Sequence, residues 1–186
     1  MEHAMRRSIW AAFAGTVLAF SITPAAAAWN TYFSKAGLEF SFNAPAALKA
    51  EKASYTSRMA GTHDSVVFKA VEDNVEFKVT VVDFTGRGSD EPALIKEASD
   101  GFLAMTNVLL DTEARVESSY GRKLTVDLPN KSGRSMSAIF FKDDHLIQLQ
   151  ATVLPGGDMQ TPDMSRFVDS LAFYDTEGAT ELKLTN

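Results

Sequence analysis

Two short segments of the sequence combine a histidine with carboxylates, which are side chains that bind divalent metals or transfer protons. His63 is followed by Asp64, and His145 follows Asp143 and Asp144. Imidazole and carboxylate groups are ligands for a divalent cation, and with a further acid from another strand they would be the minimum for an acid–base enzyme. Neighbouring residues of a hairpin point to different sides, so neither segment closes a metal shell alone. We therefore predict solvated turn residues at both places and no metal site.

Residues for covalent catalysis are missing from the sequence. The chain has no cysteine, so it lacks a thiol nucleophile, a disulfide and an attachment point for lipid. It also lacks a Gly-x-Ser-x-Gly element, and Ser99 and Ser132 fall in a predicted helix and a predicted loop. The sequence therefore predicts no catalytic residue, no cofactor-binding residue and no cofactor.

Alternation of apolar and polar residues with a period of two runs through several segments, which is typical of strands with one buried face. The clearest example is the segment from Val75 to Val81. Turn residues at 72–74 join it to the predicted strand 66–70, and those at 61–64 join that strand to 55–59, which gives an antiparallel meander. A turn is predicted at Gly121 and a hairpin across 142–145. The other predicted strands are 38–42, 55–59, 66–70, 114–120, 123–128, 136–141 and 146–154.

Two helices are predicted to pack on these strands. Pro92 suits a first helical turn, and Asp90 and Glu91 are favourable near the positive end of the helix dipole. Thr161, followed by Pro162, predicts the start of the second helix. The predicted buried stripes are Leu94, Ala98, Phe102, Met105 and Leu109 in the first helix, and Met164, Phe167, Val168 and Leu171 in the second.

The predicted strands carry apolar residues on the face opposite their main buried set as well. One interpretation is that a helix covers each face, which makes the fold an α+β, α/β/α sandwich around an antiparallel sheet of about six to eight strands. The other is an exposed interaction patch. The residues concerned are Val67, Val82, Phe84, Ile139 and Phe141.

The N-terminus has the three regions of a signal peptide: Arg6 and Arg7, an apolar run over 9–22, and small residues before a cleavage site between Ala28 and Trp29. The paired arginines leave twin-arginine export as the alternative to general secretion. The formal net charge of −6 argues against nucleic acid and anionic membrane surfaces as partners. After cleavage we expect no membrane association, and the aromatic residues that follow are expected to dock onto the domain.

The order of these elements and the closing segment 166–173, with its Arg-Phe-Val-Asp-Ser-Leu-Ala-Phe sequence, resemble the PsbP-like fold family. The resemblance implies an α/β/α sandwich and a noncatalytic accessory or binding role. We accordingly expect a signal peptide over 1–28, a single PsbP-like domain over 29–175 and a polar C-terminal tail over 176–186.

The expected function is that of an exported periplasmic or secreted accessory protein that binds another envelope protein. The alternative is a carrier or sensor of a small apolar ligand, and an uncharacterised enzyme or metal-binding protein comes third. The carrier hypothesis rests on phenylalanines that would line a cavity. They are Phe40, Phe42, Phe68, Phe77, Phe102 and Phe140.

Overall fold

The computed structural model describes residues 29–34, 38–45, 47–86, 90–104, 107–173 and 179–182. The predicted signal peptide and its cleavage junction at Ala28 therefore lie outside the described residues. Within the described ranges, no helix has both the length and the apolar character that a bilayer crossing requires.

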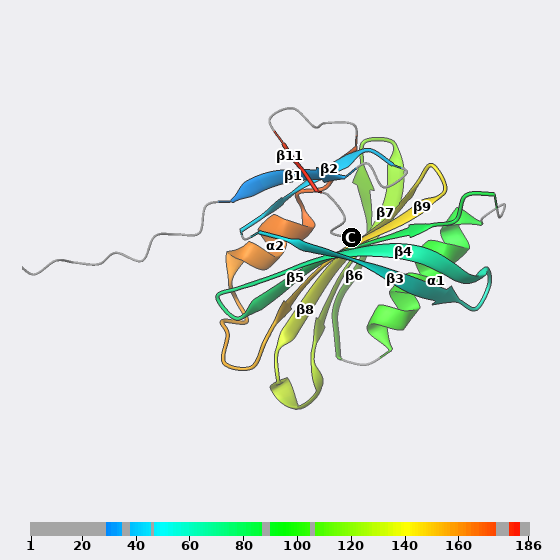
Figure 1. Ribbon diagram of the computed structural model, residues 1–186. Coiled ribbons are helices and arrows are strands. Elements are labelled where there is room, and N and C mark those ends of the chain that lie inside the picture. Colours follow the sequence, from blue (N-terminus) through cyan, green and yellow to red (C-terminus); the bar gives the residue numbers. More distant parts are fainter. Residues whose placement is uncertain are drawn as a thin grey trace, which may run out of the picture.

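A seven-stranded antiparallel sheet is the centre of the fold (Figure 1). Its strand order is β3-β4-β5-β9-β8-β7-β6, so β3 and β6 are its edges. The strand count and the α+β class agree with the sequence prediction. The strands are β3 (Lys49–Ser57), β4 (Gly61–Glu72), β5 (Val75–Asp83), β6 (Asn107–Val116), β7 (Ser119–Asp127), β8 (Arg134–Lys142) and β9 (His145–Val153).

A smaller sheet of four strands packs on one face of the large sheet. Its strand order is β10-β2-β1-β11, and β11 pairs with β1 in parallel. Two residues of the predicted C-terminal tail thus belong to a strand, because Thr180 and Glu181 lie opposite Tyr32 and Phe33. The strands are β1 (Asn30–Ser34), β2 (Phe40–Ala44), β10 (Ala172–Phe173) and β11 (Thr180–Glu181).

Helix α1 (Glu91–Leu103) covers part of the other face. Asp90 caps it by accepting a hydrogen bond from the Ala93 N–H at 3.2 Å, and Leu94, Ala98 and Phe102 are buried as predicted. The predicted stripe is wrong at Leu109, which lies in β6 with 46% of its surface exposed. Ladder pairing of 107–116 with β7 outcompetes the helical pattern there.

Helix α2 (Pro162–Val168) lies on the face of the large sheet opposite α1 (Figure 1). Together with the small sheet it closes one core, while α1 closes a second core on the other face. The α/β/α layering predicted from the sequence is therefore present, with the small sheet as an addition to the α2 layer. A short 3₁₀ helix, η1 (Pro129–Lys131), connects β7 to β8.

Two predicted turns lie elsewhere in the structure. The β6–β7 turn is at Glu117, which has a φ of 53°, and Gly121 is inside β7 opposite Phe140. A Cβ on Gly121 would lie 2.2 Å from the Ile139 carbonyl oxygen, so glycine is required there for close packing. The predicted turn over 61–64 is also displaced, because β4 already begins at Gly61.

Candidate functional site

His63 is a buried strand residue, so the prediction of a solvated turn residue is wrong for it. Its Nδ1 lies 3.1 Å from the Asp83 carbonyl oxygen and its Nε2 lies 3.0 Å from the Ala60 carbonyl oxygen. Its ring also packs on Phe84 at a centroid distance of 4.3 Å. Both ring nitrogens are engaged by backbone oxygens, so His63 fastens β4 to the end of β5.

His145 is likewise buried, at the start of β9. Its Nδ1 contacts the backbone oxygen of Asp143 at 2.6 Å, and its Nε2 lies 3.8 Å from Asp83 Oδ1 without a hydrogen-bond partner among the described residues. Hydrogen bonds from Thr85 lower the pKa of Asp83. Asp83, which is directly opposite His145 in the ladder, thus brings a carboxylate close to the imidazole ring. Across the described ranges, no group of three or more such side chains could hold a metal ion.

The exposed-patch interpretation is wrong, because all five residues of that set are buried. All except Val67 form a core with α1. Their exposure is between 0% and 3%, and that of Val67 is 9%. The sheet face is apolar at these positions because the helix rests on it. The members are Val67, Val82, Phe84, Ile139 and Phe141.

The phenylalanines expected to line a ligand cavity fall into two separate cores. Five of them, Phe40, Phe42, Phe68, Phe77 and Phe140, belong to the core beneath α2 and the small sheet, whereas Phe102 belongs to the core beneath α1. Each is at most 8% exposed. The six rings therefore do not surround one cavity.

The aromatic residues after the predicted cleavage site dock onto the domain, as expected. Tyr32 is buried, and Trp29 packs edge-on against Phe77 at 6.0 Å between ring centroids. The guanidinium of Arg166 lies 4.1 Å above the Trp29 ring. This segment consequently belongs to the folded domain.

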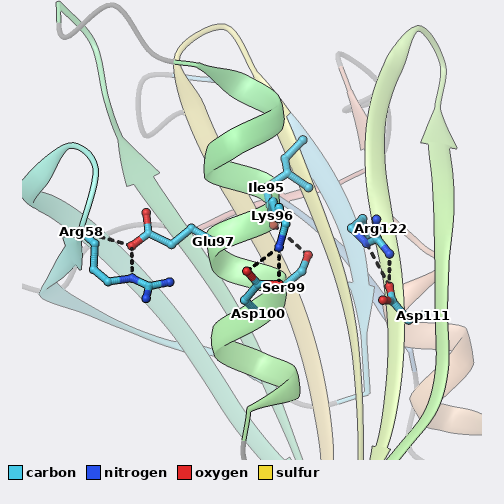
Figure 2. Close-up of polar contacts among 8 residues, drawn as sticks. All are labelled: Arg58, Ile95, Lys96, Glu97, Ser99, Asp100, Asp111 and Arg122. Carbon is cyan, nitrogen blue, oxygen red and sulfur yellow. Dashed lines mark hydrogen bonds and ion pairs between the residues drawn. The ribbon is translucent and has the colours of Figure 1, made fainter.

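One candidate binding surface is a groove between α1 and the β6–β7 hairpin, which we call the α1–β6 groove. Its volume is about 510 Å³. Figure 2 shows α1 beside the Arg122–Asp111 pair of β7 and β6; Arg122 Nε donates to Asp111 Oδ1 at 2.9 Å. The lining residues are Glu91, Pro92, Ile95, Lys96, Ser99, Asp100, Leu103, Asp111, Glu113, Tyr120, Gly121 and Arg122.

The charges of the α1–β6 groove are mostly acidic. Its two basic side chains are engaged within the chain, because Lys96 pairs with Asp100 at 2.7 Å and Arg122 pairs with Asp111. Glu91 and Glu113 are exposed and form no ion pair with another described residue. The groove therefore presents net negative charge beside the apolar Ile95 and Leu103.

Strand β6 forms the outer border of this groove and is one of the two edges of the large sheet. Val108, Leu109 and Leu110 are 46%, 46% and 44% exposed, and Tyr120 of the neighbouring strand is 56% exposed. The ladder shifts register between Val108 and Leu110, which is typical of a β-bulge. Tyr120 lies opposite Arg115, whose guanidinium stacks over its ring, so we call Val108, Leu109 and Leu110 alone the β6 edge.

A second groove lies between α1 and β3, over the centre of the large sheet, and has a volume of about 760 Å³. We call it the Lys78 groove. Its wall is tied together by Glu97 of α1, which accepts hydrogen bonds from Ser57 Oγ and the Arg58 N–H, each at 2.6 Å (Figure 2 shows Arg58 and Glu97). Its floor is polar. The floor residues are Lys78, Ser135, Gln148, Gln150 and Thr152.

Both surfaces were missed by the sequence analysis. Three consecutive apolar residues at 108–110 break the period-two alternation, and this was a usable signal for an exposed edge. Gln148 and Gln150 alternate with apolar residues along β9, but alternation does not reveal that a helix covers only part of the face on which they lie. No feature of the sequence distinguished Lys78 from the other polar residues of its strand.

The comparisons with known proteins returned little at the level of sequence. No family model matches the chain, and no curated protein matches it. Among solved structures, the chain is similar to the solution structure of cyanobacterial PsbP (CyanoP) from Synechocystis sp. PCC 6803. The identity is 11%, the TM-score is 0.49, and the match covers 87% of this chain and 99% of that chain.

Proposed function

We propose that this chain is an exported accessory protein without catalytic activity, which binds another protein of the cell envelope through the β6 edge and the adjoining α1–β6 groove. The observation that carries the proposal is the run of three exposed aliphatic residues, Val108, Leu109 and Leu110, on an edge strand. Edge strands offer unpaired backbone groups, and soluble proteins normally protect them.

The opposite edge of the same sheet supports this interpretation by contrast. Strand β3 carries Lys49, Glu51 and Lys52, all exposed, and charged residues of this kind discourage pairing with another strand. Strand β6 also carries exposed charged residues, at Asp111, Glu113 and Arg115, but unlike β3 it presents three consecutive exposed aliphatic residues. Such an edge favours addition of an extended segment from a partner, in which main-chain hydrogen bonds supply affinity and side chains supply specificity.

The partner expected at this surface is an extended segment with apolar and basic side chains. Apolar side chains would contact the β6 edge, and a lysine or arginine would lie near Glu113 and Glu91, since opposite charges on neighbouring strands attract. A second copy of this chain fits less well because each copy carries a formal charge of −6. The occupant is therefore a different protein.

Photo-crosslinking in the natural host tests this proposal. A photoreactive phenylalanine analogue at Leu109, in the full chain with its leader, is expected to give one reproducible adduct. The same analogue at Met59, which is 59% exposed in the β3–β4 turn, is the matched control. Mass spectrometry is expected to place the crosslink in a segment of the partner that contains lysine or arginine.

A pair of charge substitutions sharpens the test. Leu110→Glu is expected to remove the adduct because it places a carboxylate on the β6 edge, whereas Val71→Glu, at a residue 56% exposed on β4, is expected to leave it unchanged. Equal adducts from positions 59 and 109, or an adduct composed only of a second copy, would contradict the proposal.

A further inference from the structure

Lys78 lies on the floor of the Lys78 groove, in an environment that penalises its positive charge. It is partly buried, and among the described residues no carboxylate forms an ion pair with it. Burial lowers the pKa of Lys78; Glu76 opposes this shift and Lys69 adds to it. The ammonium group is therefore available to a negatively charged ligand that reaches the groove.

The neighbouring strand places a second cation next to Lys78. Lys69 of β4 is directly opposite Lys78 of β5 in the antiparallel ladder, and like charges directly opposite each other destabilise a sheet. Lys69 is already paired with Glu51 at 2.9 Å. Because Lys78 lacks such a partner, an anion at its ammonium would offset this repulsion.

On the other side of Lys78, β9 supplies two amide side chains that the sheet holds in place. Gln150 is directly opposite Lys78, and its Nε2 donates to Ser135 Oγ at 3.3 Å and to Thr152 Oγ1 at 3.2 Å. Gln148 Nε2 donates to Ser137 Oγ at 3.0 Å. Within the described part of the chain no donor reaches either amide oxygen, so both can accept a hydrogen bond from a ligand hydroxyl.

The size of the groove and its walls restrict the ligand further. A bare inorganic anion would fill a small part of about 760 Å³, a volume that is typical of sites for small organic molecules. The walls add the apolar surfaces of Tyr55 and Phe102. They also contain Arg58, Glu97 and Asp100, and both of these carboxylates are already paired with cations of the chain. We propose that the Lys78 groove binds a small hydroxylated carboxylate of the sugar-acid type, with the carboxylate at Lys78 and hydroxyl groups at Gln148 and Gln150.

Titration of the full mature chain with D-glucuronate, followed by amide chemical shifts, tests this inference independently of the β6 edge. Saturable shifts are expected around the groove residues, with much weaker binding of neutral D-glucose. Lys78→Met is expected to weaken glucuronate binding at least about tenfold, the loss of one charge-assisted hydrogen bond. Lys52→Met, which removes the same charge from the other face of the sheet, is the matched control.

A second variant keeps the inference testable should methionine disturb the floor. Gln150→Glu adds a carboxylate directly opposite Lys78, so it is expected to abolish glucuronate binding while the fold remains intact. Absence of saturable shifts at millimolar glucuronate would overturn the inference. Equal affinity for glucose, or unchanged binding in the Lys78→Met and Gln150→Glu variants, would overturn it as well.

Discussion

Glu97 holds the wall of the Lys78 groove, and replacing it by glutamine is the sharpest test of how α1 is fixed to the sheet. Its side chain is 10% exposed, and each carboxylate oxygen accepts a separate hydrogen bond, one from Ser57 Oγ and one from the Arg58 N–H. Ser57 Oγ in turn accepts from the backbone N–H groups of Met59 and Ala60. One carboxylate thereby orders the entire β3–β4 turn.

Glutamine has one oxygen, so it can satisfy one of the two donors. In Glu97→Gln the amide NH₂ would face either the Arg58 N–H, which is itself a donor, or the Ser57 Oγ, which already accepts two hydrogen bonds. In either orientation one hydrogen bond is lost. We expect the free energy of unfolding to fall by about 2 kcal/mol at neutral pH, the loss of one hydrogen bond to a charged group. The Arg58 guanidinium adds little because its side chain is 80% exposed.

The pH dependence of this loss has a definite sign. Burial raises the pKa of Glu97, but hydrogen bonds from Ser57 and Arg58 and the charge of Arg58 outweigh burial and hold it below the usual value of 4.5. A lowered carboxyl pKa stabilises the fold above the unfolded-state value, and this contribution disappears as the pH falls through the folded-state value. The difference between wild type and Glu97→Gln should therefore shrink in acid.

Urea unfolding at neutral and acidic pH measures both quantities. Glu113→Gln is the matched control, because Glu113 is exposed in β6 and its substitution is expected to change stability by no more than about 0.5 kcal/mol. Equal stability of Glu97→Gln and wild type at neutral pH would refute the reasoning. A loss that stays constant into acid would refute the assignment of the effect to the ionised carboxylate.

Further predictions concern packing and processing. Gly121→Ala should destabilise the protein by about 3 kcal/mol or more, because its Cβ would lie 2.2 Å from the Ile139 carbonyl oxygen. Gly101→Ala, in open space on α1, should instead stabilise it by about 0.5–1 kcal/mol. Thermal unfolding of the two variants checks both signs. Mass spectrometry of the protein from its natural host is expected to find Trp29 at the N-terminus; a chain that retains Met1 would contradict the leader prediction.

Much of the fold could be predicted because each element carries its own local signal. Alternation from Val75 to Val81 corresponds to β5, whose residues in this run alternate between buried and partly buried. Pro92 and Thr161 indicate where α1 and α2 begin, and each helix starts within one residue of the residue that indicated it. Local patterns succeed here because strand pleat and helix caps depend on neighbours in the chain.

The errors arose where a distant contact outweighed the local pattern. Leu109 has helical spacing from Phe102, yet it lies in β6 because pairing with β7 is available. Gly121 looked like a turn residue, although its lack of a side chain serves contact with β8. His63 and His145 looked like solvated turn residues, but both are buried in strands beside Asp83.

By itself the sequence determined most of the strands, the starts of both helices and which faces of the strands are apolar. Only the tertiary structure decided that β6 is an edge and that Lys78 lies opposite Lys69 and Gln150 on a partly uncovered face. The physical reason is that alternation defines the face to which a side chain points. The neighbours across that face follow from strand order and helix placement, which packing of the whole chain sets.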